Sequence, residues 1–485
     1  MKQLLSKKIF LLLTIFATGT FAFSNIVPLS QAEHQEQIEK TEQFPQEENT
    51  SYYKPTALNH ILGFTEPFLA NLTIWSYDKF ILDAPFVQIS PETVKRNFTT
   101  PWVWDQDEFY VNHFCHPYIG SIYYTSARSN NLPVWESFLA ALSGSLTWEL
   151  FAENELPSYN DLIITTIGGF SFGEILHRLY YVVADKSRFA ATLINPMASL
   201  NNLIFRNRTN NPNGEITTLE TKLFTGLVNK KIYFKETNSE NNILPMFFYG
   251  GAELNLIYGD PYGHKTTTPY TTFDMNIKVS GTKNYYNMSL FTDGIILSFA
   301  PNQSDTFHTT LGLSLHYDFL LSNITHYSKN ALSLTAKQQI ELPNNWDIKW
   351  ALHLNYIFLG GNDFYYLFSK SNNPFELDIP NRLYDLTWGG GVKSSFSISN
   401  PYAGTLKLYG NFDISKTINN SLPEGGSYGF FLIGIASASY EHKIFKSFSM
   451  GLEYDFYMKN ANYKTAEDLF EIKQIANIYF KNKFN

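Results

Sequence analysis

Carboxylate and imidazole side chains recur at helical spacing in the N-terminal half of this chain. His113 and His116 are three positions apart, so a helix would place both on one face, where two neutral imidazoles can bind a metal ion. Glu149 and Glu153, four positions apart, would share a face in the same way. Glu174 begins a Glu-x-x-His step of the kind that di-iron bundles use, but those bundles need two copies and the sequence has one. The pattern permits a metal site and specifies neither a metal nor a cofactor, which stay unknown.

The same residues also permit an acid–base centre. His113 or His116 would act as the general base, and Glu149 or Asp161 would orient it. A nucleophile is harder to find, because no nearby serine lies in a Gly-x-Ser-x-Gly elbow and Cys115 lacks papain-type surroundings.

A third interpretation is structural, and it is the one that we favour. Carboxylates and imidazoles inside a short helical bundle can pair with Arg128 and Arg178 and cap helices. The candidate site that all three interpretations share comprises His113, His116, Glu149, Glu153, Asp161 and Glu174.

Short motifs surround these residues in a specific order. They are Trp-x-Asp-x-Asp, Asn-His-x-x-His-Pro, Gly-Ser-x-Tyr-Tyr, Ala-Arg, Trp-Glu, Glu-x-x-x-Pro-Ser-x-x-Asp and Gly-Gly-x-x-x-Gly-Glu, followed by Asn195–Pro196. Over about residues 60–208 the chain resembles the bacterial envelope family described as domain of unknown function 3943. The resemblance implies an outer-membrane location in Gram-negative bacteria, and it implies no reaction.

Helices must position the candidate residues. Apolar residues recur three and four apart in the segments 61–80, 134–153 and 160–183, which predicts helices there. Ser158 and Asp161 fit a helix start, and Pro133 and Pro157 fit loops. We therefore expect a helical domain over residues 59–210.

A two-residue alternation replaces the helical spacing in the C-terminal half. Leu311 to Phe319 shows it, with apolar residues at odd positions and mostly polar residues at even ones. Long strands of this kind predict an antiparallel transmembrane β-barrel over residues 211–485. A soluble β-sandwich is the alternative, and ten or fourteen strands are possible. We count twelve segments: 216–228, 245–258, 270–282, 285–299, 304–319, 328–342, 345–360, 383–399, 403–414, 427–443, 446–458 and 470–484.

The N-terminus fits export from the cytoplasm. Lysines precede an apolar stretch and small residues follow it, so residues 1–22 read as a signal peptide. Residues 23–58 are polar and are expected to form a disordered linker. Phe484, next to the last residue, resembles the signal that barrel-assembly machinery recognises. Outer-membrane lipid and that machinery are therefore the expected partners, at the cell outer membrane.

Composition argues against other partners. A net charge of −8 with many aromatic residues speaks against nucleic acid. No Walker or dinucleotide pattern surrounds Gly168, Gly169 and Gly173, which speaks against a nucleotide.

The expected function is therefore a structural or transport-related outer-membrane barrel, with the helices as a plug inside it or as a periplasmic domain beneath it. An envelope enzyme acting on lipid or glycan through the candidate residues is the alternative. A surface receptor that works through external loops is a third possibility.

Overall fold

The computed structural model describes residues 53–205, 210–212, 214–283, 285–301, 303–363, 382–423 and 425–484. The expected signal peptide, residues 1–22, and nearly all of the expected linker lie outside these residues.

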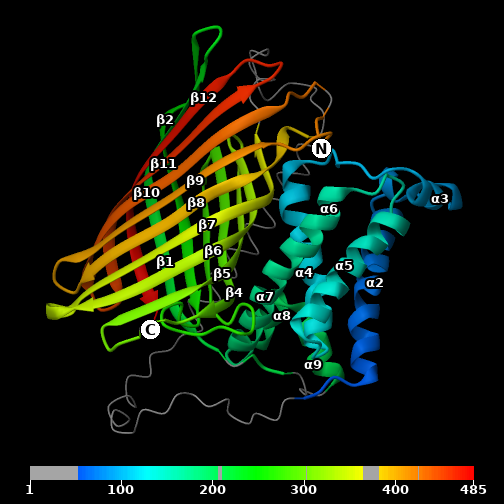
Figure 1. The fold of residues 1–485 in the computed structure, drawn as a ribbon, viewed down its shortest axis with the longest axis horizontal. Helices are drawn as coiled ribbons and strands as arrows, with labels where there is room; N and C mark the ends of the chain where they lie inside the picture. The colour runs from blue at the N-terminus through cyan, green and yellow to red at the C-terminus, as the bar shows by residue number, and fades with distance from the viewer. Residues whose placement is uncertain are drawn as a thin grey trace.

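The C-terminal half is a closed antiparallel barrel of twelve strands, as the sequence predicts. Each strand pairs with its neighbours along the chain, and β1 pairs with β12 to close the sheet (Figure 1). The strands are β1 (Ile216–Phe234), β2 (Ser239–Tyr258), β3 (Phe273–Thr282), β4 (Tyr285–Phe299), β5 (Phe307–Ser322), β6 (His326–Leu342), β7 (Trp346–Asp363), β8 (Tyr384–Asn400), β9 (Gly404–Thr417), β10 (Gly429–Phe445), β11 (Phe448–Tyr463) and β12 (Leu469–Phe484).

The alternation along each strand separates the lumen from the outer face. On β5, His316 and Asp318 point inward, where both are buried among other polar groups. The apolar positions point outward, and Leu334 and Leu354 on the next two strands are 62% and 50% exposed. Polar residues inside and apolar residues outside are the arrangement of a membrane barrel.

The N-terminal half is a bundle of helices. Its long helices are α2 (Ala57–Phe80), α4 (His116–Ser129), α5 (Val134–Phe151) and α7 (Gly169–Ala184). Shorter elements are α3 (Pro91–Thr99), α6 (Tyr159–Ile163), α8 (Arg188–Ile194), α9 (Pro196–Ile204) and two π-helical segments, Val111–Cys115 and Ile164–Gly168; 3₁₀ turns lie at Pro85–Val87 and, between β6 and β7, at Pro343–Asn345. Side chains of Thr56, Ser90, Ser158, Ser187 and Asn195 cap the helices that follow them.

Small residues let the helices approach closely. The helix α4 lies at the centre of the bundle, in contact with α2, α5 and α7. A Cβ atom on Gly120 would lie 1.8 Å from the carbonyl oxygen of Thr165, so α4 and the start of α7 meet backbone to backbone. Gly173 likewise leaves room for the ring of Tyr124. Such contacts are common where helices pack without a hydrophobic driving force between them.

The bundle lies against the outer wall of the barrel (Figure 1). Phe109 stacks on the outward ring of Phe319 at 5.6 Å, and the hydroxyl of Tyr317 donates to the carbonyl oxygen of His113 over 2.5 Å. Phe172 on α7 also contacts Tyr317. These helices therefore cover the outside of β4 to β8, and the structure does not place them as a plug in the lumen.

Large apolar side chains are exposed on the surface of the bundle. They include Ile61, Phe68, Trp135, Phe189 and Leu203. Within the described part of the chain, no helix has both the length and the hydropathy needed to cross a membrane.

The two faces of the barrel wall predict opposite responses to charge. Leu354→Arg, which points outward from β7, should cost about 2–4 kcal/mol of stability if it lies near the middle of a bilayer. Ser395→Arg, which points into the lumen on the neighbouring strand β8, should be tolerated far better. Folding into lipid vesicles, read from the heat-modifiable band on gels, measures both. An equal loss in the two variants would contradict the assignment of faces.

Candidate functional site

Four of the six candidate residues, His116, Glu149, Glu153 and Asp161, lie close together in the structure. His116 is the first residue of α4, and its Nε2 lies 3.6 Å from Asp161 Oδ1 on α6. Its other ring nitrogen, Nδ1, lies 3.0 Å from the hydroxyl of Thr165 in the π-helical segment before α7. Asn160 also donates to Asp161 Oδ1 over 2.8 Å. The imidazole is thus held between a hydroxyl group and a carboxyl group.

Further carboxyl groups surround this pair. Glu149 accepts a hydrogen bond from the backbone N–H of Ser158 over 2.7 Å, and Glu153 accepts one from the indole of Trp148 over 3.1 Å. Asp105 accepts one from the backbone N–H of Asp107 over 2.8 Å. We call Asp105, Asp107, Glu149, Glu153 and Asp161 the acidic cluster.

Burial favours the protonated form of four carboxyl groups in this cluster. Burial, together with the charge of Asp105, raises the pKa of Asp107 to about 7. Burial and neighbouring carboxylates likewise raise the pKa values of Glu149, Glu153 and Asp161 well above their usual range. Burial lowers the pKa of His116, although Asp105 and Asp107 oppose this change. Asp107 can therefore donate and accept a proton near neutral pH.

Glu174 lies elsewhere in the bundle and is fully paired. Its carboxylate accepts from Arg128 Nε over 2.8 Å, from Arg178 Nε over 3.0 Å and from the hydroxyl of Tyr124 over 2.8 Å. Burial alone would raise the pKa of Glu174, but the two guanidinium groups lower it to about 2. This arrangement is the buried pairing that the structural interpretation predicts for this residue.

His113 does not join His116, contrary to the spacing argument. Its Nδ1 lies 2.9 Å from the hydroxyl of Ser328 on β6, and its ring packs against Phe109. Residues 111–115 form a π-helix, in which hydrogen bonds join residues five apart, so a spacing of three no longer aligns side chains as in an α-helix. His113 therefore fixes the bundle to the barrel wall.

The candidate residues do not form a metal site with the expected geometry. Among the described residues, one group of three histidine and carboxylate side chains has its ligand atoms within 4.8 Å of one another. That group contains none of the six candidate residues.

A second candidate site lies in the barrel, and the sequence did not reveal it. A cavity of about 450 Å³ occupies the lumen. Lys349 and Lys407, at the starts of β7 and β9, line the cavity, and the side chain of each is more than a third exposed. The cavity therefore reaches toward the end of the barrel where β1 begins and β12 ends. We call this space the lumen cavity. Other lining residues of both charges are Lys222, Glu253, Asp274, Lys278, Lys393, Glu453, Asp455 and Lys473.

Apolar and aromatic side chains cross the lumen at its other end. They form one buried cluster, which we call the luminal barrier: Ile232, Phe234, Tyr327, Phe431, Ile433, Tyr457, Ala461, Tyr463 and Leu469. Tyr327 on β6 and Leu469 on β12 come from opposite sides of the twelve-strand ring, so the cluster reaches across the lumen from β10–β12 and β1 to β6.

Ion pairs between walls support the barrier and line the cavity. Lys459 on β11 lies 2.5 Å from Asp363 on β7 and 2.8 Å from Glu471 on β12. Lys278 on β3 pairs with Glu453 on β11 at 2.8 Å. Alternation predicts that such residues face inward, but which of them meet depends on register and curvature, which one sequence does not specify.

The carboxyl groups of Glu174 and Asp107 predict opposite effects of pH on the stability of the fold. The lowered pKa of Glu174 means that its ion pairs stabilise the fold above about pH 4.5, and that this contribution is lost as pH falls toward 2. The raised pKa of Asp107 means that the fold is destabilised as pH rises from about 4 through 7.

Glu174→Gln should therefore cost roughly 3–5 kcal/mol at pH 8, because it leaves two buried guanidinium groups without a carboxylate. Asp107→Asn should be nearly neutral at pH 4 and should stabilise the protein at pH 8. Unfolding midpoints in detergent across this pH range measure both variants. Changes of the same sign at pH 8 would contradict the analysis.

Several solved barrel structures are similar to this chain. An outer membrane channel from Pseudomonas putida F1 is 9% identical with a TM-score of 0.27, covering 55% of this chain and 95% of that one. A FadL homologue from Pseudomonas aeruginosa is 8% identical with a TM-score of 0.23, covering 56% and 91%. The outer membrane protease OmpT from Escherichia coli is 7% identical with a TM-score of 0.20, covering 56% and 98%. No curated protein sequence matches the chain.

The family resemblance rests on the helical half. A family model described as domain of unknown function (DUF3943) matches residues 101–200. This segment includes the acidic cluster, His113, His116 and the Arg128–Glu174–Arg178 group. The resemblance that the motifs indicate is therefore confirmed over residues 101–200, which form part of the helical bundle beside the barrel.

Proposed function

We propose that this chain is a transport-related barrel of the outer membrane, whose lumen cavity binds a small polar solute and whose luminal barrier keeps the far end closed. The observation that carries the proposal is the lumen itself. It combines a polar cavity of about 450 Å³ with a barrier of packed apolar side chains. A cavity of this size suits one small ligand.

The outer surface supports the membrane location. Outward side chains such as Leu334 and Leu354 form an apolar belt on the barrel. The helical bundle, which lies beside the barrel, also exposes apolar side chains such as Ile61 and Trp135. Lipid acyl chains are the partner that covers both surfaces in our proposal, because exposed apolar surface of this extent is otherwise costly in water.

The connections between strands support an orientation. Three of the five connections at the cavity end have two or three residues, namely 343–345, 401–403 and 446–447. The opposite end carries the longest connection, 364–383, together with 418–428. The difference between the ends lies in this longest connection, because the cavity end also has the 14-residue connection 259–272 and the opposite end also has the short turns 283–284 and 323–325. Outer-membrane barrels have short periplasmic turns and long external loops. The lumen cavity therefore faces the periplasm in our proposal, and the barrier faces outward.

The charges of the lumen cavity indicate the kind of solute. Lys222 and Lys278 offer ammonium groups, and both already share Glu453 as a partner. A solute that carries both charges, or several hydroxyl groups, could replace part of these pairings without leaving a buried charge alone. A purely apolar solute could not.

Conductance across planar bilayers tests the proposal. The wild-type barrel should pass little current, because the luminal barrier fills one end. Phe431→Ala removes a fully buried ring from that barrier and should increase the current several-fold. Phe430→Ala, one residue away on the outer face, is the matched control and should leave the current unchanged. An open pore in the wild type, or equal currents in the two variants, would contradict a closed barrier.

An enzyme acting on envelope lipid is the second candidate, and one observation favours it. The side chain of His116 lies between those of Thr165 and Asp161. Thr165 belongs to one π-helical segment and His116 directly follows the other, and such segments are frequent at functional sites. In this alternative the Thr165 hydroxyl attacks an ester carbonyl, and His116 takes its proton and returns it to the alcohol that leaves as the ester C–O bond breaks. Water then hydrolyses the acyl-threonine and restores the hydroxyl.

Incubation with phospholipid and lipopolysaccharide in mixed micelles separates the two candidates. The enzyme predicts product that disappears in Thr165→Ala and Asp161→Asn but persists in Thr166→Ala, the neighbouring control. The transport proposal predicts no such product.

A further inference from the structure

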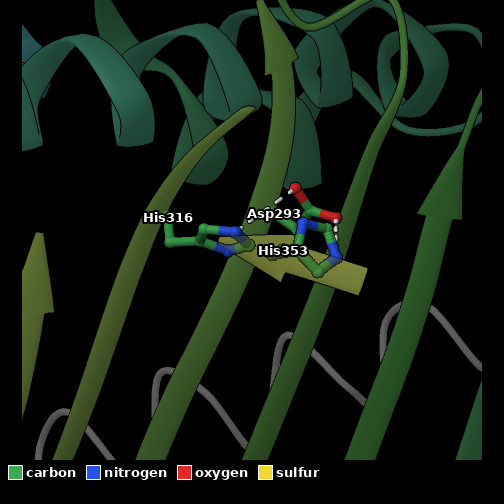
Figure 2. Close-up of side chains that lie close together, drawn as sticks. All are labelled: Asp293, His316 and His353. Atoms are coloured by element: carbon green, nitrogen blue, oxygen red, sulfur yellow. Dashed lines mark ion pairs between the residues drawn. The ribbon is translucent and has the colours of Figure 1, made fainter. Parts of the chain in front are cut away.

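Three polar side chains converge on the inner wall of the barrel, outside the acidic cluster. Asp293 on β4, His316 on β5 and His353 on β7 each offer one ligand atom, and these atoms lie within 4.8 Å of one another (Figure 2). His316 Nε2 lies 4.0 Å from Asp293 Oδ1, and His353 Nε2 lies 3.6 Å from Asp293 Oδ2. The scattered positions of these histidines in the sequence gave no ligand spacing. Strand pairing, which sets His316 directly opposite Asp293, brings them together.

Both imidazoles are held by the ring nitrogen that points away from Asp293. His316 Nδ1 lies 3.2 Å from the carbonyl oxygen of Thr292, and His353 Nδ1 lies 3.0 Å from the hydroxyl of Thr335. A proton on Nδ1 leaves Nε2 with a free lone pair directed at the carboxylate. Histidines that bind metals are oriented in this way by an outer partner of the other nitrogen.

Two of the converging atoms have no hydrogen-bond partner among the described residues. They are Nε2 of His316 and Oδ1 of Asp293, and both residues are more than nine-tenths buried. Leaving such atoms unpaired is costly. A cation between them would satisfy both.

The neighbouring lysines are already paired with carboxylates. Lys337 lies 2.7 Å from Asp293 Oδ2 and 3.1 Å from Asp274. Lys393 lies 3.3 Å from His316 Nδ1, but it donates to Asp318 over 2.9 Å. Oδ1 of Asp293 therefore remains available, together with the Nε2 atoms of the two imidazoles.

We propose that Asp293, His316 and His353 bind one zinc ion in the lumen. Two imidazole nitrogens and one carboxylate oxygen are a zinc donor set that leaves a fourth position open. Ligand atoms around tetrahedral zinc are about 3.3 Å apart, so His316 Nε2 and Asp293 Oδ1, now 4.0 Å apart, would approach by about 0.7 Å on binding. The ligand atoms of all three residues, now within 4.8 Å of one another, would close around the ion in the same way. Asp293 and His353 line the lumen cavity, so water or an anionic group of a solute in the cavity can take the open position.

Metal binding to the full-length protein in detergent tests the site. After chelation and dialysis, the protein is titrated with zinc alone by calorimetry and with cobalt(II) alone by visible absorption, which reports tetrahedral coordination. We expect one metal per chain. Binding should be lost in His316→Gln and His353→Gln and retained in His442→Gln, which removes an exposed histidine on β10. Thr335→Val keeps all three ligands and should weaken zinc binding by about 10- to 100-fold, because it removes the partner of His353 Nδ1.

Each outcome decides the proposal. The heat-modifiable band shows whether each variant has folded, and Thr335→Val with the wild-type cobalt spectrum provides the answer if the histidine variants do not fold. A wild type that binds no zinc overturns the proposal. Stoichiometric binding that survives in folded His316→Gln and His353→Gln overturns it as well, because the metal would then lie elsewhere, for example at the acidic cluster.

Discussion

Pairing between the first strand and the last is the constraint on which this molecule depends. The hydrogen bonds from Leu219–Phe484 to Phe234–Leu469 close the sheet and leave it without a free edge. Once the sheet is closed, the polar side chains of each strand face the lumen and the apolar side chains face outward. Inward charged groups then find their partners among side chains from other strands. Lysines reaching across the lumen to carboxylates, as Lys278 does to Glu453, are the result.

The barrel could be predicted from the sequence, because strand alternation is a local property. The twelve predicted segments agree with the observed strands to within a few residues at most ends. The contacts within the lumen could not be predicted, because they depend on which inward residues face one another after closure. His316 and His353 illustrate this, since they are 37 positions apart and join only through the strands between them.

The helical half was harder to place. Tyr317 and Phe319 fit the pattern of lipid-facing residues, and nothing in that pattern distinguishes contact with lipid from contact with helices. The candidate residues also belong to three separate groups in the structure, which their spacing in the sequence does not reveal. Glu174 belongs to a paired group, His113 to the barrel contact, and His116 with Asp161 to the acidic cluster. The π-helical turn at 111–115 separates the two histidines, and no simple sequence rule predicts such a turn.

The contact between bundle and barrel also has a consequence for the order of assembly. The hydrogen bond from Tyr317 to His113 joins residues 204 positions apart, and that from Asn112 to Tyr384 joins residues 272 apart. The helices leave the ribosome first, yet the wall on which they dock consists of strands made much later. Contacts of such long range form slowly, because chain entropy must be lost before they stabilise anything. Docking of the bundle is therefore a late step of maturation, which follows the formation of β4 to β8.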